Sequence, residues 1–232
     1  MEILGHRWKS LHKIGGISAL IIAVLLIGEV FVYAVLPRPA SPLECIELFL
    51  KNPLFGLLHF DMLGMISYLF FIPLTLSLYL LIRSKSESLA LIATVLFFIG
   101  IAVFFASNTS FSLLSLSKQY ALAETEDQKM MLLSSCQTMI TLFNVQAFMI
   151  SYLIVSAAWV MIGIVMLKGD LFSRFASWMG ILAGASGIIA EGLENTSKLF
   201  RIPAIGFYFA AIVFLFIWVL YTGRQLLRIA KD

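Results

Sequence analysis

The chain has 232 residues, of which 61% are hydrophobic and 12% are charged, and its mean hydropathy is +0.99. A water-soluble domain carries roughly a quarter charged residues, so this composition excludes an ordinary soluble protein. The formal net charge is only +3 and the sequence has no basic tract, so nucleic acid is not an expected partner. Glycine loops for nucleotides and the catalytic patterns G-x-S-x-G and H-E-x-x-H are also absent from the sequence.

Six segments are long and apolar enough to cross a membrane, which takes about 20 residues. They are 14–36, 55–82, 89–106, 145–167, 175–193 and 205–221. The sequence therefore predicts one integral membrane domain over 1–232, an all-α polytopic bundle with six transmembrane helices. Leu4, Trp8 and Leu11 share one helical face among several basic residues, so residues 1–13 predict a short interfacial helix before the first span.

The distribution of Lys and Arg predicts the orientation of the bundle. Ten of the 16 basic residues fall on the side that holds both termini and the short connections 83–88 and 168–174. Cytoplasmic segments are enriched in Lys and Arg, so both termini are expected in the cytoplasm. Trp8, Trp178 and Trp218 lie near the predicted cytoplasmic ends of their helices, which agrees with this orientation.

The connection between the third and fourth spans also reads as helical. Thr125-Glu126-Asp127-Gln128 is a capping box, which marks the start of a helix, and residues 111–123 before it form another helical segment. The third and fourth helices are therefore expected to continue past the membrane on the outer side, as a helical hairpin that turns near 123–125.

Part of the sequence resembles a known family. Leu89-Ala-Leu-Ile-Ala and the run Ala106-Ser-Asn-Thr-Ser-Phe-Ser-Leu-Leu-Ser-Leu-Ser-Lys-Gln-Tyr120 resemble a widespread prokaryotic family of membrane proteins. That family is known only as a domain of unknown function, number four-three-eight-six. The resemblance continues through Gln137–Asn144 and Val165–Lys168, and covers most of the chain from Ile14 onward. It implies a prokaryotic plasma-membrane location and brings no reaction, so no residue role follows from it.

Three carboxylates lie inside predicted spans, each towards the outer end: Glu29, Asp61 and Glu191. A carboxylate in the membrane interior costs on the order of 3 kcal/mol, so such residues usually face the bundle and mark a site. The alternative is that they are buried hydrogen-bonding groups or lie at the water interface. His59 is then either a hydrogen-bond donor to a nearby carboxylate or a catalytic partner. It is the only histidine at this depth, so neither a metal nor a cofactor is expected.

Helical spacing gives three faces that could line one cavity with the acids. These faces are Asp61, Gly64, Tyr68 and Thr75; Gln137, Thr141, Asn144 and Ser151; and Gly180, Gly184, Gly187 and Glu191. The sequence predicts an outward-facing polar pocket that continues into an apolar interior. The expected ligand contacts are Asp61, Tyr68, Gln137, Thr141, Asn144 and Glu191. The glycine face alternatively serves only to let two helices pack closely.

Three functions fit this pattern. The first is binding of a lipid or another apolar or amphipathic small molecule in the outer pocket. The second is an intramembrane enzyme, hydrolase or cyclase-like, that uses Glu29, Asp61 or Glu191 as general acid or base with His59 as partner. The third is a small proton-coupled transporter, since intramembrane acids can carry protons. The sequence leaves these alternatives open.

The two cysteines, Cys45 and Cys136, both fall on the predicted outer side. A disulfide between them would persist there, because glutathione and thioredoxin do not keep that compartment reduced. The alternative is two unpaired thiols that serve as small apolar residues. Sequence alone does not give the distance between them, so both states stay open.

Overall fold

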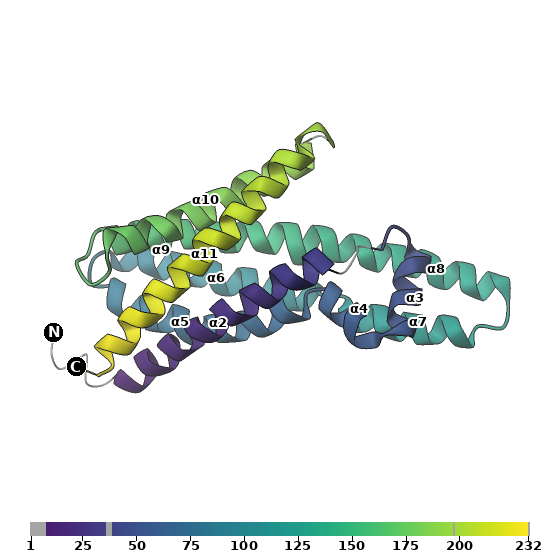
Figure 1. Ribbon diagram of the computed structural model, residues 1–232, viewed down its shortest axis with the longest axis horizontal. Helices are drawn as coiled ribbons and strands as arrows, with labels where there is room; N and C mark the ends of the chain where they lie inside the picture. Colours follow the sequence, from purple (N-terminus) through teal and green to yellow (C-terminus); the bar gives the residue numbers. More distant parts are fainter. Residues whose placement is uncertain (1–7, 36–38, 197, 232) are drawn as a thin grey trace.

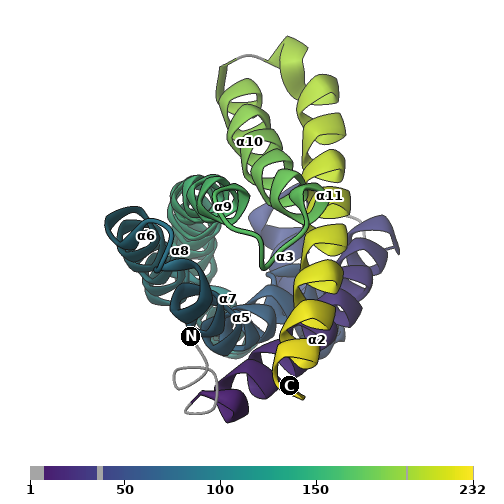
Figure 2. The same cartoon turned by 90° about the vertical axis from the view of Figure 1, so that its left-hand side faces the viewer.

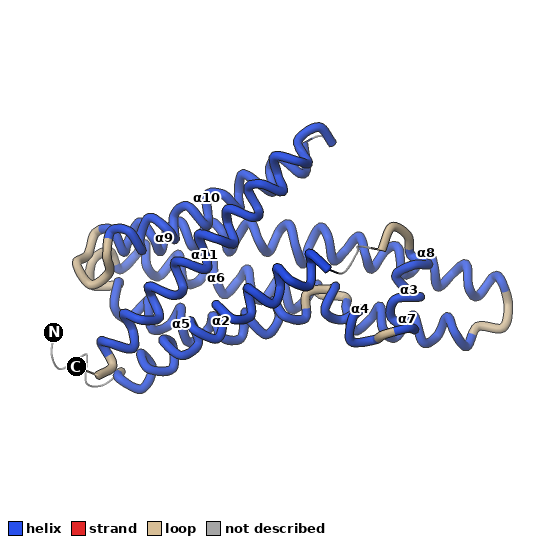
Figure 3. Tube along the Cα trace, in the orientation of Figure 1, coloured by secondary structure: helices blue, strands red, loops and turns tan. Residues whose placement is uncertain are grey.

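The computed structural model describes residues 8–35, 39–196 and 198–231. Within these ranges the chain consists of helices joined by short turns, without a strand (Figure 3). The described residues contain six helices that are long and apolar enough to span a membrane, which confirms the predicted all-α bundle with six spans. Two of them are longer than their spans, because the third helical run reaches Leu122 and the fourth begins at Glu126.

Six long helices form a closed ring. They are α2 (Lys9–Val35), α5 (Met62–Ile82), α6 (Glu87–Ser107), α9 (Ser151–Leu167), α10 (Arg174–Thr196) and α11 (Arg201–Ile229). Each helix contacts the next in this order, and α11 contacts α2, as the view along the bundle in Figure 2 shows. Phe71, Phe97, Trp159 and Trp218 are buried in the core of the ring.

The glycines of the ring let helices approach closely. A Cβ atom on Gly16 would lie 3.0 Å from the carbonyl oxygen of Gly223, where α2 meets α11. A Cβ atom on Gly184 would overlap the carbonyl oxygen of Ser156, where α10 meets α9. Gly180 lies against Trp218 of α11 in the same way. The glycine face of α10 is thus a packing surface, which supports the simpler interpretation of that pattern.

The remaining helices pack together at one end of the bundle, and we refer to them as the cap. They are α3 (Pro42–Lys51), α4 (Pro53–His59), α7 (Ser110–Leu122) and α8 (Glu126–Leu142). Figure 1 shows the cap at the opposite end from the start of α2 and the end of α11. The cap has its own apolar core, made by Cys45, Ile46, Phe49, Phe60, Phe104, Leu113, Cys136, Phe143 and Ala147.

Helices α7 and α8 contact each other and are joined by residues 123–125. The predicted capping box is present, since the Thr125 hydroxyl accepts from the Gln128 amide and the Gln128 side chain accepts from the Thr125 amide, both at 3.3 Å. The projection of α7 and α8 on the outer side of a membrane stays a prediction.

Three predicted segments differ from the structure. The second span does not run unbroken from 55 to 82, because α4 ends at His59 and α5 begins at Met62. The fourth helical run contains a π-helix, η1 (Phe143–Ile150), between α8 and α9. The first long helix already begins at Lys9, so residues 9–13 are part of α2, while residues 1–7 of the predicted interfacial helix lie outside the described residues.

Candidate functional site

The site begins at the break between α4 and α5. Asp61 has a left-handed backbone conformation with φ of 63°, which Asp tolerates better than most residues. Its carboxylate caps α5 by accepting a hydrogen bond from the Gly64 amide at 3.2 Å. A Cβ atom on Gly64 would overlap that carboxylate, so a larger residue there would displace the Asp61 side chain from its capping position. Asp61 is therefore both buried and fixed in position by the helix that it starts.

Glu29 reaches the same place from α2. The Ser67 hydroxyl of α5 donates a hydrogen bond to its carboxylate at 3.0 Å. The charges of Glu29 and Asp61 interact, so the two carboxyl groups are neighbours although they come from different helices. Asp61 is buried and Glu29 is half-buried, and the sequence pattern had suggested that these acids lie near each other.

Two tyrosines connect these acids to α9. The Tyr68 side chain interacts electrostatically with Asp61, Glu29 and Tyr152, and it hydrogen bonds with Ser151. The Ser151 hydroxyl in turn donates to the carbonyl oxygen of Gly100 at 2.8 Å. Tyr68 was expected among the ligand contacts, whereas Tyr152 was not.

Glu191 completes the set from α10. It is buried, and it hydrogen bonds with the hydroxyl of Tyr208 in α11. The ring centroids of Tyr208 and Tyr152 are 6.2 Å apart, and Tyr152 interacts with both Glu191 and Glu29. We call the connected side chains the acid–tyrosine cluster, and its members are Glu29, Asp61, Tyr68, Tyr152, Glu191 and Tyr208.

His59, the last residue of α4, lies beside the cluster and packs against aromatic rings. Its ring meets Tyr33 edge-on with centroids 6.4 Å apart and meets Phe60 edge-on at 5.6 Å. The side chain is buried. These contacts place His59 between α2 and the core of the cap.

Three expected ligand contacts are not brought into the cluster. Gln137, Thr141 and Asn144 are exposed, and the Thr141 hydroxyl donates to the carbonyl of Gln137 in its own helix. Ser151 is buried, so the four residues do not share one face and the prediction of one continuous polar stripe is wrong. The reason is the π-helix η1, which contains Asn144 and ends just before Ser151, because its wider turns shift the facing of the residues that follow.

An apolar groove lies between α2 and α11. Its volume is about 200 Å³, and its lining residues are Leu26, Ile27, Val30, Phe209, Ile212, Val213 and Phe216. Val30 follows Glu29 in the chain and Phe209 follows Tyr208, so the groove and the cluster occupy the same depth.

The crossing of α2 and α11 explains why the groove exists. The two helices touch where Gly16 faces Gly223, and Figure 1 shows that they cross at an angle. Val30 is 14 positions from Gly16, which is about 20 Å along the helix at 1.5 Å per residue. Over that distance the helices separate, and apolar side chains line the opening.

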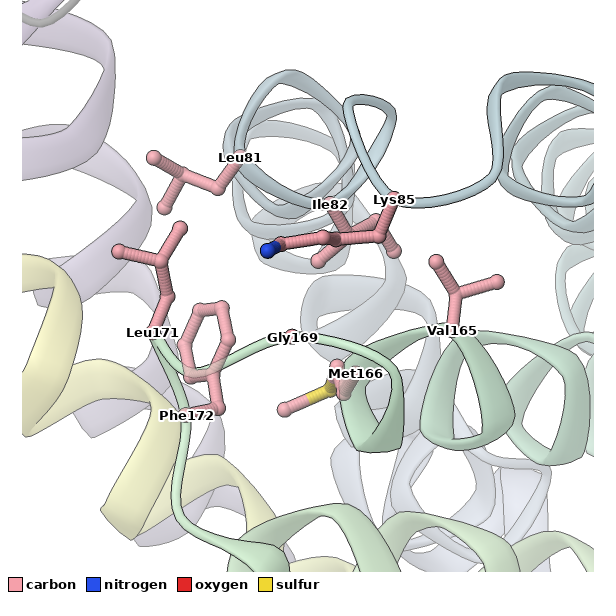
Figure 4. A pocket seen from close by; sticks show the side chains of 8 residues that line it. All are labelled: Leu81, Ile82, Lys85, Val165, Met166, Gly169, Leu171 and Phe172. Atoms are coloured by element: carbon pink, nitrogen blue, oxygen red, sulfur yellow. The ribbon is translucent and has the colours of Figure 1, made fainter. Parts of the chain in front are cut away.

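A second cavity lies at the other end of the bundle and is too small for a ligand. Its volume is about 10 Å³, enough for roughly one water molecule. Figure 4 shows the Lys85 side chain extending across it, between Leu171 and the end of α9. The Lys85 ammonium lies 3.8 Å from the carboxylate of Asp170. This cavity is lined mainly by apolar residues and contains none of the predicted site residues.

Six apolar helices in a ring, with buried acids at one depth, define the protein as a polytopic helical membrane protein. Residues 14–227 match the family model described as "Domain of unknown function (DUF4386)", and the chain belongs to this family. No curated protein matches the chain. No solved structure matches it either.

Proposed function

We propose that this protein binds a membrane lipid or a similar amphipathic molecule, with its polar head at the acid–tyrosine cluster and its apolar tail in the groove between α2 and α11. The observation that carries this proposal is that the groove lies at the depth of the cluster, because Val30 and Phe209 of its lining directly follow Glu29 and Tyr208. An amphipathic ligand needs an apolar channel and a polar end in contact, and lipid is the molecule that surrounds such a groove in a membrane.

The polar contacts set the affinity in this proposal. A lipid tail gains little free energy on leaving the bilayer for the groove, because bilayer and groove are equally apolar. Carboxylates and tyrosine hydroxyls at Glu29, Asp61 and Tyr208 offer acceptors and donors to a head group. A hydrogen bond to a charged group contributes about 1.5–3 kcal/mol, which is enough to retain one lipid over its neighbours.

The direct test fills the groove. Ile212→Trp places a large ring between α2 and α11, whereas Ile205→Trp places the same ring on an exposed position of α11 outside the groove. Native mass spectrometry of protein released from a mild detergent should show a retained lipid on the wild type and on Ile205→Trp. Ile212→Trp should lose most of it. Equal lipid retention by both variants would contradict the proposal.

The location that goes with this function is a prokaryotic plasma membrane with both termini in the cytoplasm. Its support is the excess of Lys and Arg beside the short connections 83–88 and 168–174. With this orientation the cap and the acid–tyrosine cluster lie towards the outer face, and the ligand is a lipid of the outer leaflet.

An intramembrane enzyme is the second candidate, and the pairing of Glu29 with Asp61 favours it. Two neighbouring carboxyl groups can divide the roles of general acid and general base. Incubation of the purified protein with membrane lipids, followed by mass spectrometry, should then reveal a product that Glu29→Gln no longer makes. Lipids recovered unchanged by the wild type would exclude this reaction for the lipids tested.

A further inference from the structure

The cap holds two thiols in contact. Cys45 of α3 and Cys136 of α8 are both fully buried in the apolar core of the cap, and their side chains interact. The Cys136 thiol also donates to the carbonyl oxygen of Pro42 at 3.7 Å, which keeps its sulfur against the first turn of α3. Both are free thiols in the structure.

We propose that Cys45 and Cys136 are joined by a disulfide in the mature protein, and that this bond fastens α3 to α8. The two cysteines are neighbours across a helix contact, and no large backbone movement is needed to join side chains that already touch. The bond requires only that the cap lies outside the cytoplasm, and it does not depend on which ligand the protein binds.

The oxidant is the disulfide of a thiol oxidoreductase outside the cytoplasm. The Cys136 thiolate attacks one sulfur of that disulfide, which breaks the bond and releases one thiolate of the oxidant. The Cys45 thiolate then attacks the Cys136 sulfur and displaces the second oxidant sulfur as a thiolate. Cys45 and Cys136 lose two electrons and two protons together, and the oxidant becomes a dithiol.

The exchange must precede the final packing of the cap. Both sulfurs are covered in the folded cap, and the exchange therefore takes place before α3 has packed against α8.

The bond would hold the cap against the functional site. Phe49 lies one helical turn after Cys45 and stacks on Phe60, with ring centroids 5.7 Å apart and an angle of 25° between planes. Phe60 directly precedes Asp61, whose left-handed conformation starts α5. A bond between α3 and α8 would therefore also hold the contact between Phe49 and Phe60, the residue that precedes Asp61. The loop closed by the bond includes α4, α5, α6 and α7, so it also restricts the unfolded chain.

The test counts free thiols in protein taken directly from cells. Acid is added first to stop thiol–disulfide exchange. The protein is then denatured and treated with a maleimide that carries a mass tag, with and without prior reduction. We expect no adduct on the unreduced wild type and two adducts after reduction. Cys45→Ser is the matched control, and it should show one adduct under both conditions.

Two adducts on the unreduced wild type would overturn the proposal, because both thiols would then be free in the cell. One adduct on unreduced Cys45→Ser shows that the tag reaches Cys136 after denaturation, so an absence of label on the wild type cannot come from poor access. These results are independent of lipid retention, and the disulfide and the proposed function therefore fail separately.

Discussion

At Asp61 a single carboxylate both caps α5 and interacts with Glu29. Substitution can separate these two roles. Asn adopts the left-handed conformation and caps helices as well as Asp does, so Asp61→Asn keeps the fold and removes the charge. Ala loses both the cap and the tolerance of positive φ, which together cost on the order of 2 kcal/mol.

We expect Asp61→Asn to melt at the wild-type temperature in detergent but to bind the lipid about tenfold more weakly, since one charge-assisted contact is lost. Asp61→Ala should both melt earlier and bind weakly. Glu124→Gln, which removes an exposed carboxylate at the tip of the cap, should leave both quantities unchanged. Full lipid affinity in Asp61→Asn would show that Asp61 is only a helix cap.

The sequence pointed to the acids of the cluster and to Tyr68, but not to Tyr152 and Tyr208. Glu29, Asp61 and Glu191 stand out because carboxylates are rare in spans. Tyr152 and Tyr208 do not stand out, because a tyrosine in an apolar helix reads equally well as a core or an interfacial residue. Their hydroxyl contacts depend on the ring of six helices, and no spacing along a single helix could reveal them.

Among the helices, the fourth predicted span shows where periodicity misleads. Gln137, Thr141 and Asn144 fit one α-helical face with Ser151, yet η1 contains Asn144 and ends just before Ser151. A π-helix changes the number of residues per turn without any signature in hydropathy. The break at Asp61 was missed because residues 55–82 are apolar enough as a whole to read as one span, although His59 and Asp61 interrupt them.

The contact between α9 and α10 gives a stability prediction. Gly184→Ala places a methyl group against the carbonyl oxygen of Ser156, a backbone atom that cannot move away alone. Overpacking of this kind typically costs 1–3 kcal/mol, about the scale expected here. Gly206→Ala is the control, because a Cβ atom there meets nothing within 4 Å. Thermal unfolding in detergent should show a lower midpoint for Gly184→Ala alone, and equal midpoints would contradict the tight α9–α10 contact.

For the whole molecule, the orientation in the membrane can be tested with an engineered cysteine. Ser84→Cys lies in the short turn between α5 and α6, at the end of the bundle opposite the cap. A maleimide that cannot cross membranes should not label it in intact cells and should label it after lysis. The native Cys45 and Cys136 are buried and add no background. Labelling in intact cells would invert the orientation and place the cluster near the cytoplasmic face.

Composition predicted the helical bundle with six spans, because the cost of exposing polar backbone groups to lipid leaves few alternatives to it. The groove between α2 and α11 was not predictable in the same way. It arises from a crossing at Gly16 and Gly223 that separates two helices far apart in the sequence, and its lining residues read simply as lipid-facing side chains.

The most direct test of the account is an experimental structure in a lipid nanodisc, with a bound antibody fragment to aid alignment. We predict an elongated lipid density in the groove between α2 and α11, ending in a head group beside Glu29 and Tyr208. A groove closed by Phe209 and Phe216 against α2, with the acid–tyrosine cluster free of any head group, would contradict it.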